Sequence, residues 1–164
     1  MRQTFYEFCM LHERTNLLKE WDESRSFPLT PDTVSYGSKK KVWWTCENGH
    51  SWQTTVHVRS EGSGCPYCAG RKVLPGFNDL ETLYPDVAAQ WHPSLNGALT
   101  PELVTPGSNK KVWWQCSMGH VWKSVIYPRT GAQQCSCPVC AGKVSTKHAR
   151  RYAQLDEIRT FTEL

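Results

Sequence analysis

The sequence predicts a small, β-rich α+β protein that consists of two tandem copies of one metal-stabilised module. Three observations support this prediction. A shift of 70 residues superposes the stretch 39–52 on the stretch 109–122, so that a Trp-Trp pair precedes Cys-x-x-x-His in both. Six of the eight cysteines fall into two equivalent sets, each with one histidine. Each copy spans about 55 residues, a size that buries too little apolar surface for stability without a cross-link or a metal.

The two sets have the spacing of tetrahedral zinc sites. Each reads Cys-x-x-x-His, a gap of 14 or 16 residues, then Cys-Pro-x-Cys. Two short pairs present four ligands from two tight turns, which suits Zn²⁺. Because both sets are complete, we expect two closed, structural zinc sites rather than catalytic sites with an open position. The predicted ligands are Cys46, His50, Cys65, Cys68, Cys116, His120, Cys137 and Cys140.

A disulfide scaffold is the alternative interpretation of these cysteines. We disfavour it because each set includes an equivalent histidine and the N-terminal residues lack the apolar core of a secretory signal. In the second copy, which reads CSCPVC, Cys135 competes with Cys137 as a ligand. The match to Cys-Pro-x-Cys-Ala-Gly favours Cys137 and places a two-residue insertion after Arg129. Cys9 has no equivalent, and we expect it to be a small buried residue.

Alternating polarity predicts two strands in each copy. In the first copy the alternation runs from Lys41 to Cys46 and again from Trp52 to Arg59, and SEGSG then supplies turn residues. We therefore predict a zinc-ribbon-like module, in which a short helix precedes a β-hairpin that joins one zinc knuckle to the next. A helix beginning at Cys-Pro-x-Cys would make the module a treble clef instead, but AGRKVLPG after Cys68 is a poor helix former.

Helices are predicted before the strands and at both ends of the chain. Asn16 and Asp86 occupy equivalent positions and suit the N-cap before LLKEW and VAAQW. The segments TFYEFCMLHE and STKHARRYAQLDEIRTF also have helical character, the latter with Ser145 or Thr146 as its cap. We expect the last segment to pack on its neighbour or, alternatively, to add a basic helix to a binding surface. The predicted organisation is an N-terminal helix with the first module (1–70), an ordered connector (71–86), the second module (87–142) and a basic helical tail (143–164).

Charge and hydropathy narrow the function. The net charge of +4 and the pI near 8.6 are compatible with nucleic acid without requiring it. No stretch approaches the roughly 20 apolar residues of a membrane span, so we expect no membrane partner and a reducing, cytoplasmic location. No Ser/His/Asp or Cys/His arrangement remains once the zinc ligands are set aside. We therefore expect neither enzyme activity nor a small-molecule substrate.

The adjacent tryptophans face opposite ways in a strand. Trp44 shares a face with the first zinc ligand, and we expect it in the core against the helix that carries Trp21. Trp43 either packs under a loop or offers its ring for base stacking, with lysines beside it for phosphate. Arg59 and Arg129 bind phosphate or, alternatively, pair with a carboxylate or a loop carbonyl. The candidate nucleic-acid contacts are Ser38, Lys39, Lys40, Lys41, Trp43, Arg59, Ser108, Lys110, Lys111, Trp113 and Arg129.

The combined motif resembles a bacterial and viral family of probable zinc-ribbon domains, also described as treble-clef domains, whose members often occur as tandem copies. The motif is Trp-x(16)-Ser-x-Lys-Lys-Val-Trp-Trp-x-Cys-x-x-Gly-His-x-Trp, then Arg, then Cys-Pro-x-Cys-Ala-Gly, and its two occurrences cover about 110 residues. The resemblance implies zinc at the eight positions above. It also implies nucleic-acid binding, in some members beside nuclease domains. This chain contains no Asp-x-Lys or Glu-x-Lys, which a restriction-type nuclease core needs.

We therefore predict a tandem zinc-binding protein with two structural Zn²⁺ ions that binds DNA or RNA through its Lys/Trp surfaces. The alternative is a zinc-stabilised adaptor for a protein partner. Residues 17–70 suit that alternative because they hold six Lys/Arg against six Asp/Glu, whereas residues 87–142 hold four against one.

Overall fold

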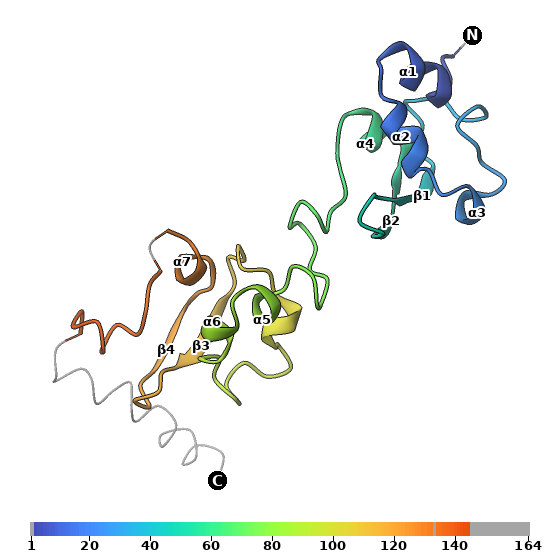
Figure 1. Cartoon of the computed structure of the whole chain (residues 1–164). Coiled ribbons are helices and arrows are strands. Elements are labelled where there is room, and N and C mark those ends of the chain that lie inside the picture. Colours follow the sequence, from blue (N-terminus) through green and yellow to red (C-terminus); the bar gives the residue numbers. More distant parts are fainter. Residues whose placement is uncertain (1, 133, 145–164) are drawn as a thin grey trace. The chain divides into compact units, whose positions relative to one another are not determined.

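The computed structural model describes residues 2–132 and 134–144, and the chain divides into two compact units, residues 1–71 and 72–164 (Figure 1). Each unit holds one two-stranded sheet and several short helices. The predicted small α+β class with two tandem modules is confirmed. The predicted tail helix from Ser145 onward lies outside the described residues. Among the helices of the described ranges, none combines the length and the apolar character that a membrane span requires.

Each hairpin carries the Cys-x-x-x-His turn at its tip. The strands are β1 (Lys41–Thr45), β2 (Ser51–Thr55), β3 (Lys111–Gln115) and β4 (Val121–Val125). The antiparallel register sets Trp44 opposite Trp52 and Trp114 opposite Trp122. Residues that pair directly lie on the same face of a sheet. All four of these indoles are buried, so one face of each hairpin forms part of a core, as the alternation predicted.

The second strand of each hairpin is shorter than predicted. The strand expected to continue to Arg59 stops at Thr55, and a helix, α4 (Val56–Ser60), follows; its counterpart is α7 (Tyr127–Thr130). The Thr55 hydroxyl accepts a hydrogen bond from the Val58 N–H and starts α4. Alternation was misleading here because Val56 is buried in the helix as it would be in a strand. The second strand therefore does not lead directly to the second ligand pair, because a helical turn lies between them.

The remaining helices precede the hairpins. They are α1 (Phe5–Leu11), α2 (Thr15–Glu20) and α3 (Glu23–Ser26) in the first unit, and α5 (Leu80–Leu83), α6 (Pro85–Ala88) and the 3-10 turn η1 (Pro101–Leu103) in the second. The predicted N-terminal helix is confirmed as α1. The predicted caps are wrong: α2 and α6 begin one residue before Asn16 and Asp86, which lie in the first turn, and neither helix has a side-chain cap.

The connector supplies the second unit with the equivalent of α1. Phe5 and Leu80 are both fully buried, and their backbone N–H groups donate to the carbonyls of Val34 and Val104, each at 2.8 Å. A side-chain N-cap precedes each of them. Phe5 and Leu80 are 75 residues apart, whereas Val34 and Val104 are 70 apart, because the second unit has five fewer residues between helix and module. Residues 72–86 thus contribute an apolar side chain to the second core.

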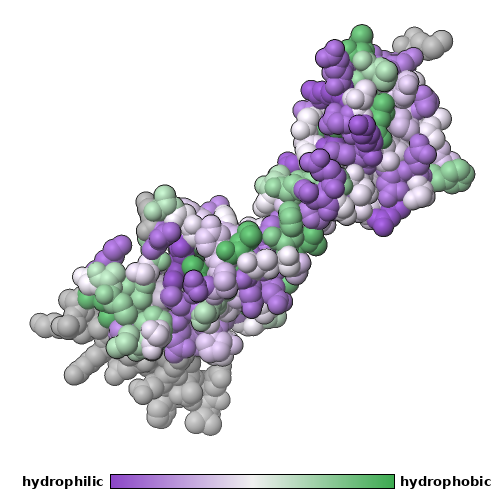
Figure 2. Space-filling model, viewed as in Figure 1, coloured by the Kyte–Doolittle hydropathy of each residue, from purple (hydrophilic) through white to green (hydrophobic). Residues whose placement is uncertain are grey.

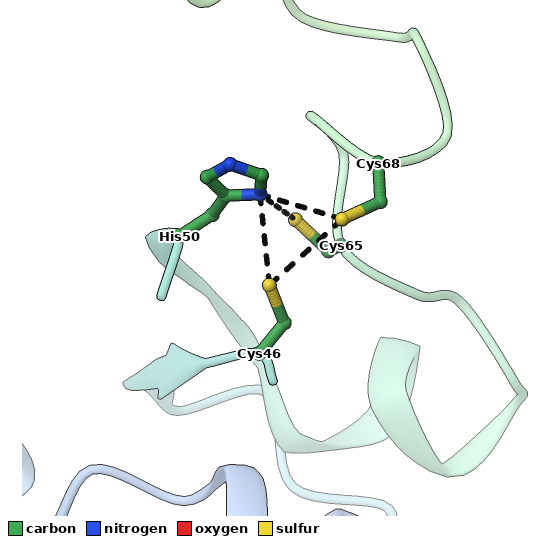
Figure 3. Close-up of side chains that lie close together, drawn as sticks. All are labelled: Cys46, His50, Cys65 and Cys68. Atoms are coloured by element: carbon green, nitrogen blue, oxygen red, sulfur yellow. Dashed lines mark hydrogen bonds between the residues drawn. The ribbon is translucent and has the colours of Figure 1, made fainter. Parts of the chain in front are cut away.

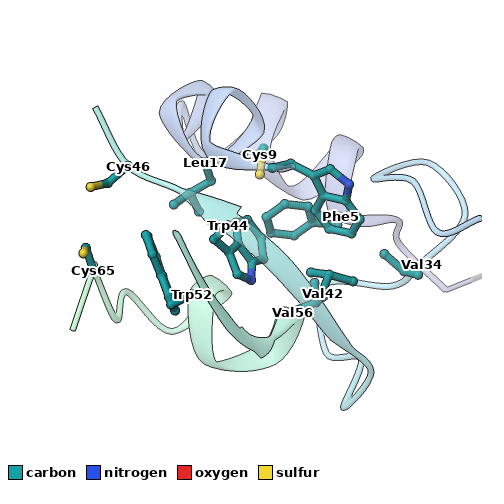
Figure 4. Close-up of a cluster of buried hydrophobic side chains, with 11 residues drawn as sticks. Phe5, Cys9, Leu17, Val34, Val42, Trp44, Cys46, Trp52, Val56 and Cys65 are labelled. Carbon is teal, nitrogen blue, oxygen red and sulfur yellow. The ribbon is translucent and has the colours of Figure 1, made fainter. Parts of the chain in front are cut away.

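Each unit has its own aromatic core. Trp44 and Trp114 are fully buried, and each meets the indole of the preceding helix edge-on, Trp21 at 5.2 Å and Trp91 at 5.4 Å. Edge-to-face contacts of this kind add to the hydrophobic contribution of buried rings. Figure 4 draws the first cluster, with the side chain of Cys9 inside it, as predicted. The core ends at the zinc ligands, so metal binding and packing stabilise the same few residues.

Candidate metal centres

A glycine turn at the hairpin tip presents the first two ligands. The N–H of Cys46 donates to the carbonyl of His50 at 3.0 Å, which continues the ladder of the hairpin, and the N–H of Gly49 donates to the carbonyl of Cys46 at 2.9 Å. Gly49 has φ of +80°, and its counterpart Gly119 has +82°. A side chain is strained in that region, so glycine permits the reversal that brings the cysteine and the histidine together.

The second pair of ligands lies on one helical turn. The N–H of Ala69 donates to the carbonyl of Cys65 at 3.0 Å, in the manner of a helix. Two further bonds then end the turn: Arg71 N–H to Pro66 carbonyl at 2.8 Å and Gly70 N–H to Tyr67 carbonyl at 3.1 Å. This pair of bonds around a left-handed glycine is a Schellman termination. The second unit repeats all three bonds: Ala141 N–H donates to the carbonyl of Cys137, Lys143 N–H to that of Pro138 and Gly142 N–H to that of Val139.

The four predicted ligands of the first unit point toward one another (Figure 3). The Nδ1 atom of His50 lies 3.6 Å from Cys46 Sγ, 3.8 Å from Cys65 Sγ and 3.3 Å from Cys68 Sγ, and Cys46 Sγ lies 3.9 Å from Cys68 Sγ. Tetrahedral Zn²⁺, with Zn–S of about 2.3 Å and Zn–N of about 2.0 Å, separates two sulfurs by about 3.8 Å and sulfur from nitrogen by about 3.5 Å. The donor set and its spacing fit one zinc ion.

The second unit builds the same centre. His120 Nδ1 lies 3.4 Å from Cys116 Sγ, 3.7 Å from Cys137 Sγ and 3.5 Å from Cys140 Sγ. Cys137 belongs to the cluster and Cys135 does not. The two-residue insertion therefore lies before the ligand pair, as the motif match predicted. Both centres fit structural Zn²⁺ with four protein ligands.

The first knuckle favours a charged thiolate. Burial disfavours ionisation of Cys46, but the backbone N–H groups of His50 and Asn48 outweigh burial and lower its pKa. Backbone groups act in the same way on Cys116. Burial raises the pKa of Cys65 to about 11. Each centre therefore pairs a thiol that ionises readily with one that needs the cation to lose its proton.

Arg59 and Arg129, predicted as candidate phosphate contacts, are buried instead, with 3% and 5% of their surface exposed. Arg59 donates to the Glu20 carboxylate and to the carbonyl of Ser63. Arg129 donates to Gln90 Oε1 at 2.7 Å. The alternative role, a carboxylate and a loop carbonyl as partners, is confirmed for Arg59. Neither guanidinium lies at the surface. Because a buried charge is costly without partners, each finds its hydrogen-bond partner inside its own unit.

Both arginines lie between two indoles and beside the zinc ligands. The Arg59 guanidinium is 5.0 Å from the ring centroid of Trp44 and 5.4 Å from that of Trp52. The Arg129 guanidinium is 4.4 Å and 5.1 Å from the equivalent rings. Three thiolates on one Zn²⁺ leave a centre with one negative charge, which a nearby cation stabilises. The repeated tryptophans thus hold an arginine that offsets the charge of the metal centre.

Trp43 and Trp113 lie on the opposite face of each hairpin and are partly exposed. Their backbones are held by one side chain from the segment before the hairpin, from α3 in the first unit and from the turn after α6 in the second. The N–H of Trp43 donates to Ser26 Oγ at 3.0 Å, and the N–H of Trp113 donates to Asn96 Oδ1 at 2.8 Å. Asn96 Nδ2 also donates to the Trp113 carbonyl at 2.9 Å. These contacts, which the sequence analysis missed, fix the backbone while leaving part of each ring at the surface.

The remaining predicted contacts surround these rings. The hydroxyls of Ser38 and Ser108 accept hydrogen bonds from Lys40 N–H at 3.2 Å and Lys110 N–H at 3.3 Å, so both serine side chains order the loop. The lysines that follow are exposed: Lys39, Lys40, Lys41, Lys110 and Lys111. A cation also stands over each ring, Arg25 at 5.2 Å from Trp43 and Lys123 at 5.5 Å from Trp113.

A family model for the probable treble clef zinc finger domain matches the chain twice, at residues 17–71 and 87–143. The chain belongs to this family. Its modules are treble-clef-like zinc fingers in which the helix that follows the second ligand pair is reduced to a single turn, which explains why the sequence after Cys68 predicted no helix. No curated protein matches the chain.

Proposed function

We propose that this zinc finger protein binds nucleic acid through the outer faces of its hairpins. The observation that carries the proposal is the contrast within each Trp-Trp pair: Trp44 and Trp114 are fully buried, whereas Trp43 and Trp113 keep part of their rings at the surface. Nucleic-acid bases stack on such rings with about 1–3 kcal/mol per base.

Exposed lysines supply the second requirement. Lys41 and Lys111 lie two residues before the partly exposed tryptophans, on the same face of the strand, because side chains alternate along a strand. Further lysines precede them in the same loop. Phosphate neutralisation by lysine releases condensed counterions and makes binding sensitive to salt. The proposal assigns no catalytic step to the chain, and the zinc ions hold the hairpins in place.

Fluorescence anisotropy tests this proposal. The zinc-loaded protein is titrated against labelled single- and double-stranded DNA and RNA across a salt series, with tryptophan fluorescence followed in parallel. We expect the logarithm of the affinity to fall linearly with the logarithm of salt concentration and tryptophan emission to be quenched. Absence of binding at low salt, where electrostatic attraction is strongest, would contradict the proposal.

A specific observation favours a protein partner as the second candidate. The outer face of α1 exposes apolar side chains, with Tyr6 42%, Met10 50% and Leu11 71% exposed. Figure 2 shows apolar atoms at the surface of the first unit where Figure 1 places α1. Contiguous exposed apolar surface is typical of protein interfaces. A photo-crosslinker at position 10 that captures one protein in cells, and loses it when Leu11 is replaced by Glu, would support this candidate.

A further inference from the structure

We propose that the two hairpin faces are unequal and that the second one is the principal site for single-stranded nucleic acid. This second hairpin face consists of Lys110, Lys111, Trp113 and Lys123. The first hairpin face consists of the equivalent residues Lys40, Lys41, Trp43 and Gln53. The inference rests on the proposed function and specifies where in the chain, and on which class of strand, it acts.

The second hairpin face has two lysines on the same face of the hairpin as its indole. The register sets Lys123 directly opposite Trp113, and the Lys123 ammonium lies 5.5 Å from the ring centroid. Lys111 lies two residues along the same strand and is exposed. A base that stacks on the exposed part of this ring would therefore have the Lys123 ammonium beside it and Lys111 on the same face, both able to contact the strand's phosphates.

The first hairpin face lacks this arrangement. Gln53 occupies the position opposite Trp43, so the strand β2 contributes no charge there. The cation over the Trp43 ring is Arg25, whose Nε lies 3.6 Å from a carboxylate oxygen of Asp22. A phosphate would compete with this carboxylate for the guanidinium.

Three carboxylates of the first module have no counterparts in the second. Asp22, Glu23 and Glu47 correspond to residues without a carboxylate, His92, Pro93 and Ser117. Asp22 and His92 both accept hydrogen bonds from the backbone of the residues that follow them. Asp22 Oδ1 accepts from the N–H of Arg25, and His92 Nδ1 accepts from the N–H groups of Ser94 and Leu95. The second unit therefore keeps this turn and lacks the negative charge that Asp22 places beside the first hairpin.

Net charge separates the two modules further. Residues 17–70 hold six Lys/Arg and six Asp/Glu, and residues 87–142 hold four and one. A centre of three thiolates and one Zn²⁺ adds one negative charge to each module. With zinc bound, the first module therefore carries −1 and the second +2. Polyanions are attracted to the second module and weakly repelled by the first.

Matched substitutions in the full-length, zinc-loaded chain test the inference. The probes are fluorescein-labelled single-stranded oligonucleotides, DNA and RNA of the same sequence, with the corresponding duplex as a third probe. We expect Trp113→Ala to weaken single-strand binding about tenfold and Trp43→Ala to weaken it less than threefold. Lys123→Gln should reduce the slope of log affinity against log salt by about 0.7, the value for one phosphate contact on a single strand. The reciprocal Gln53→Lys should strengthen binding.

The controls separate folding from binding. Every variant must retain two zinc ions per chain by metal analysis and the near-ultraviolet dichroism of its buried tryptophans. Residues 145–164 are common to all variants, so their contribution cancels in each comparison. DNA and RNA arms that differ identify which nucleic acid the site prefers.

Each outcome has a defined meaning. Equal losses from Trp43→Ala and Trp113→Ala, or a larger loss from Trp43→Ala, overturn the inference while the proposed function stands. Duplex binding that matches single-strand binding overturns the choice of single strands. No binding of any probe by the wild-type chain overturns the proposed function itself.

Discussion

The two buried arginines share their indole neighbours but differ in their charged partner. Arg59 lies between Trp44 and Trp52 and pairs with Glu20, whereas Arg129 lies between the equivalent indoles and meets the neutral amide of Gln90. Among the described residues, Nε of both arginines and Nη1 of Arg129 have no hydrogen-bond partner. The indoles and the thiolates recur in both units and the carboxylate does not. This difference indicates that the metal centre, rather than the carboxylate, is the constant counter-charge of the arginine.

Loss of a zinc ligand should have the largest effect on stability. It also tests whether the two units fold independently. Cys46→Ser is expected to remove one zinc and unfold the first unit, and Cys116→Ser should do the same to the second, because a structural zinc site contributes about 10 kcal/mol or more to folding. Metal analysis gives the stoichiometry, and hydrogen–deuterium exchange assigns the unfolding to one unit. Loss of both zinc ions from either variant would show that the units are coupled.

Replacement of the arginines should expose the difference between them. Arg59→Met leaves Glu20 without its cation and is expected to cost about 3–5 kcal/mol. Both replacements remove the cation beside the metal centre, but Arg129→Met leaves a neutral amide, not a carboxylate, without its partner and is expected to cost less, about 1–3 kcal/mol. Gln90→Glu, which copies the first unit, should stabilise the second. Urea unfolding followed by tryptophan fluorescence measures all three, and equal costs for the two arginines would show that the carboxylate contributes nothing.

Acid should weaken zinc binding to the same extent in both units. Before metal binds, the pKa of Cys65 is raised to about 11 by burial, and that of Cys140 is raised to about 11 by desolvation and by the neighbouring thiols. Both thiols hold a proton at neutral pH, so each zinc displaces at least one, and binding strengthens as pH rises toward that pKa. Zinc affinity should fall about tenfold for each pH unit and each proton displaced.

Chelator competition with the single-site variants Cys46→Ser and Cys116→Ser measures this pH dependence for each unit separately. A slope in one unit that is shallower by a whole proton would mean that one more of its thiols is already ionised before zinc binds.

Replacement of the helix N-caps should have the smallest effect on stability. Asp79 is fully buried and accepts from the N–H of Gly76 at 2.6 Å and from the N–H and hydroxyl of Thr82 at 2.9 and 2.7 Å, whereas Thr4 caps α1 at the surface. Asp79→Ala is therefore expected to cost about 2 kcal/mol and Thr4→Ala about 1 kcal/mol in urea unfolding. A larger cost for Thr4→Ala would contradict the argument that burial and additional hydrogen bonds make Asp79 the stronger cap.

The Asp79 contribution should also depend on pH. Burial disfavours the Asp79 carboxylate, but its hydrogen bonds to Thr82 and Gly76 outweigh burial and lower its pKa. Because the folded-state pKa lies below the unfolded value of about 3.9, the stabilisation is complete above that value and is lost as pH falls below it. The difference in stability between wild type and Asp79→Ala should thus be constant from pH 8 down to about pH 5.

The sequence predicted the metal centres better than the chain path between them. Ligand spacing and a repeated histidine are local patterns, and they identified all eight donors as the structure groups them. The helix at Val56 was missed because Val56 continues the two-residue spacing of Trp52 and Thr54, and it is buried in the helix as it would have been in a strand. The equivalence of Phe5 and Leu80 was missed because the repeat distance changes between helix and module. The burial of Arg59 depends on indoles that only the folded hairpin brings together.

The side chains that bind the Trp43 and Trp113 backbones have a consequence for how this chain avoids misassembly. β1 and β3 share the sequence Lys-Val-Trp-Trp, so either strand has the composition to pair with the hairpin of the other copy, or of another molecule. Unpaired strand edges invite such exchange, and tandem repeats are especially exposed to it. The Asn96 amide imitates a peptide group and occupies both backbone positions of Trp113 that a third strand would use. Nearly identical neighbours can thus be synthesised in one chain and each keep its own hairpin.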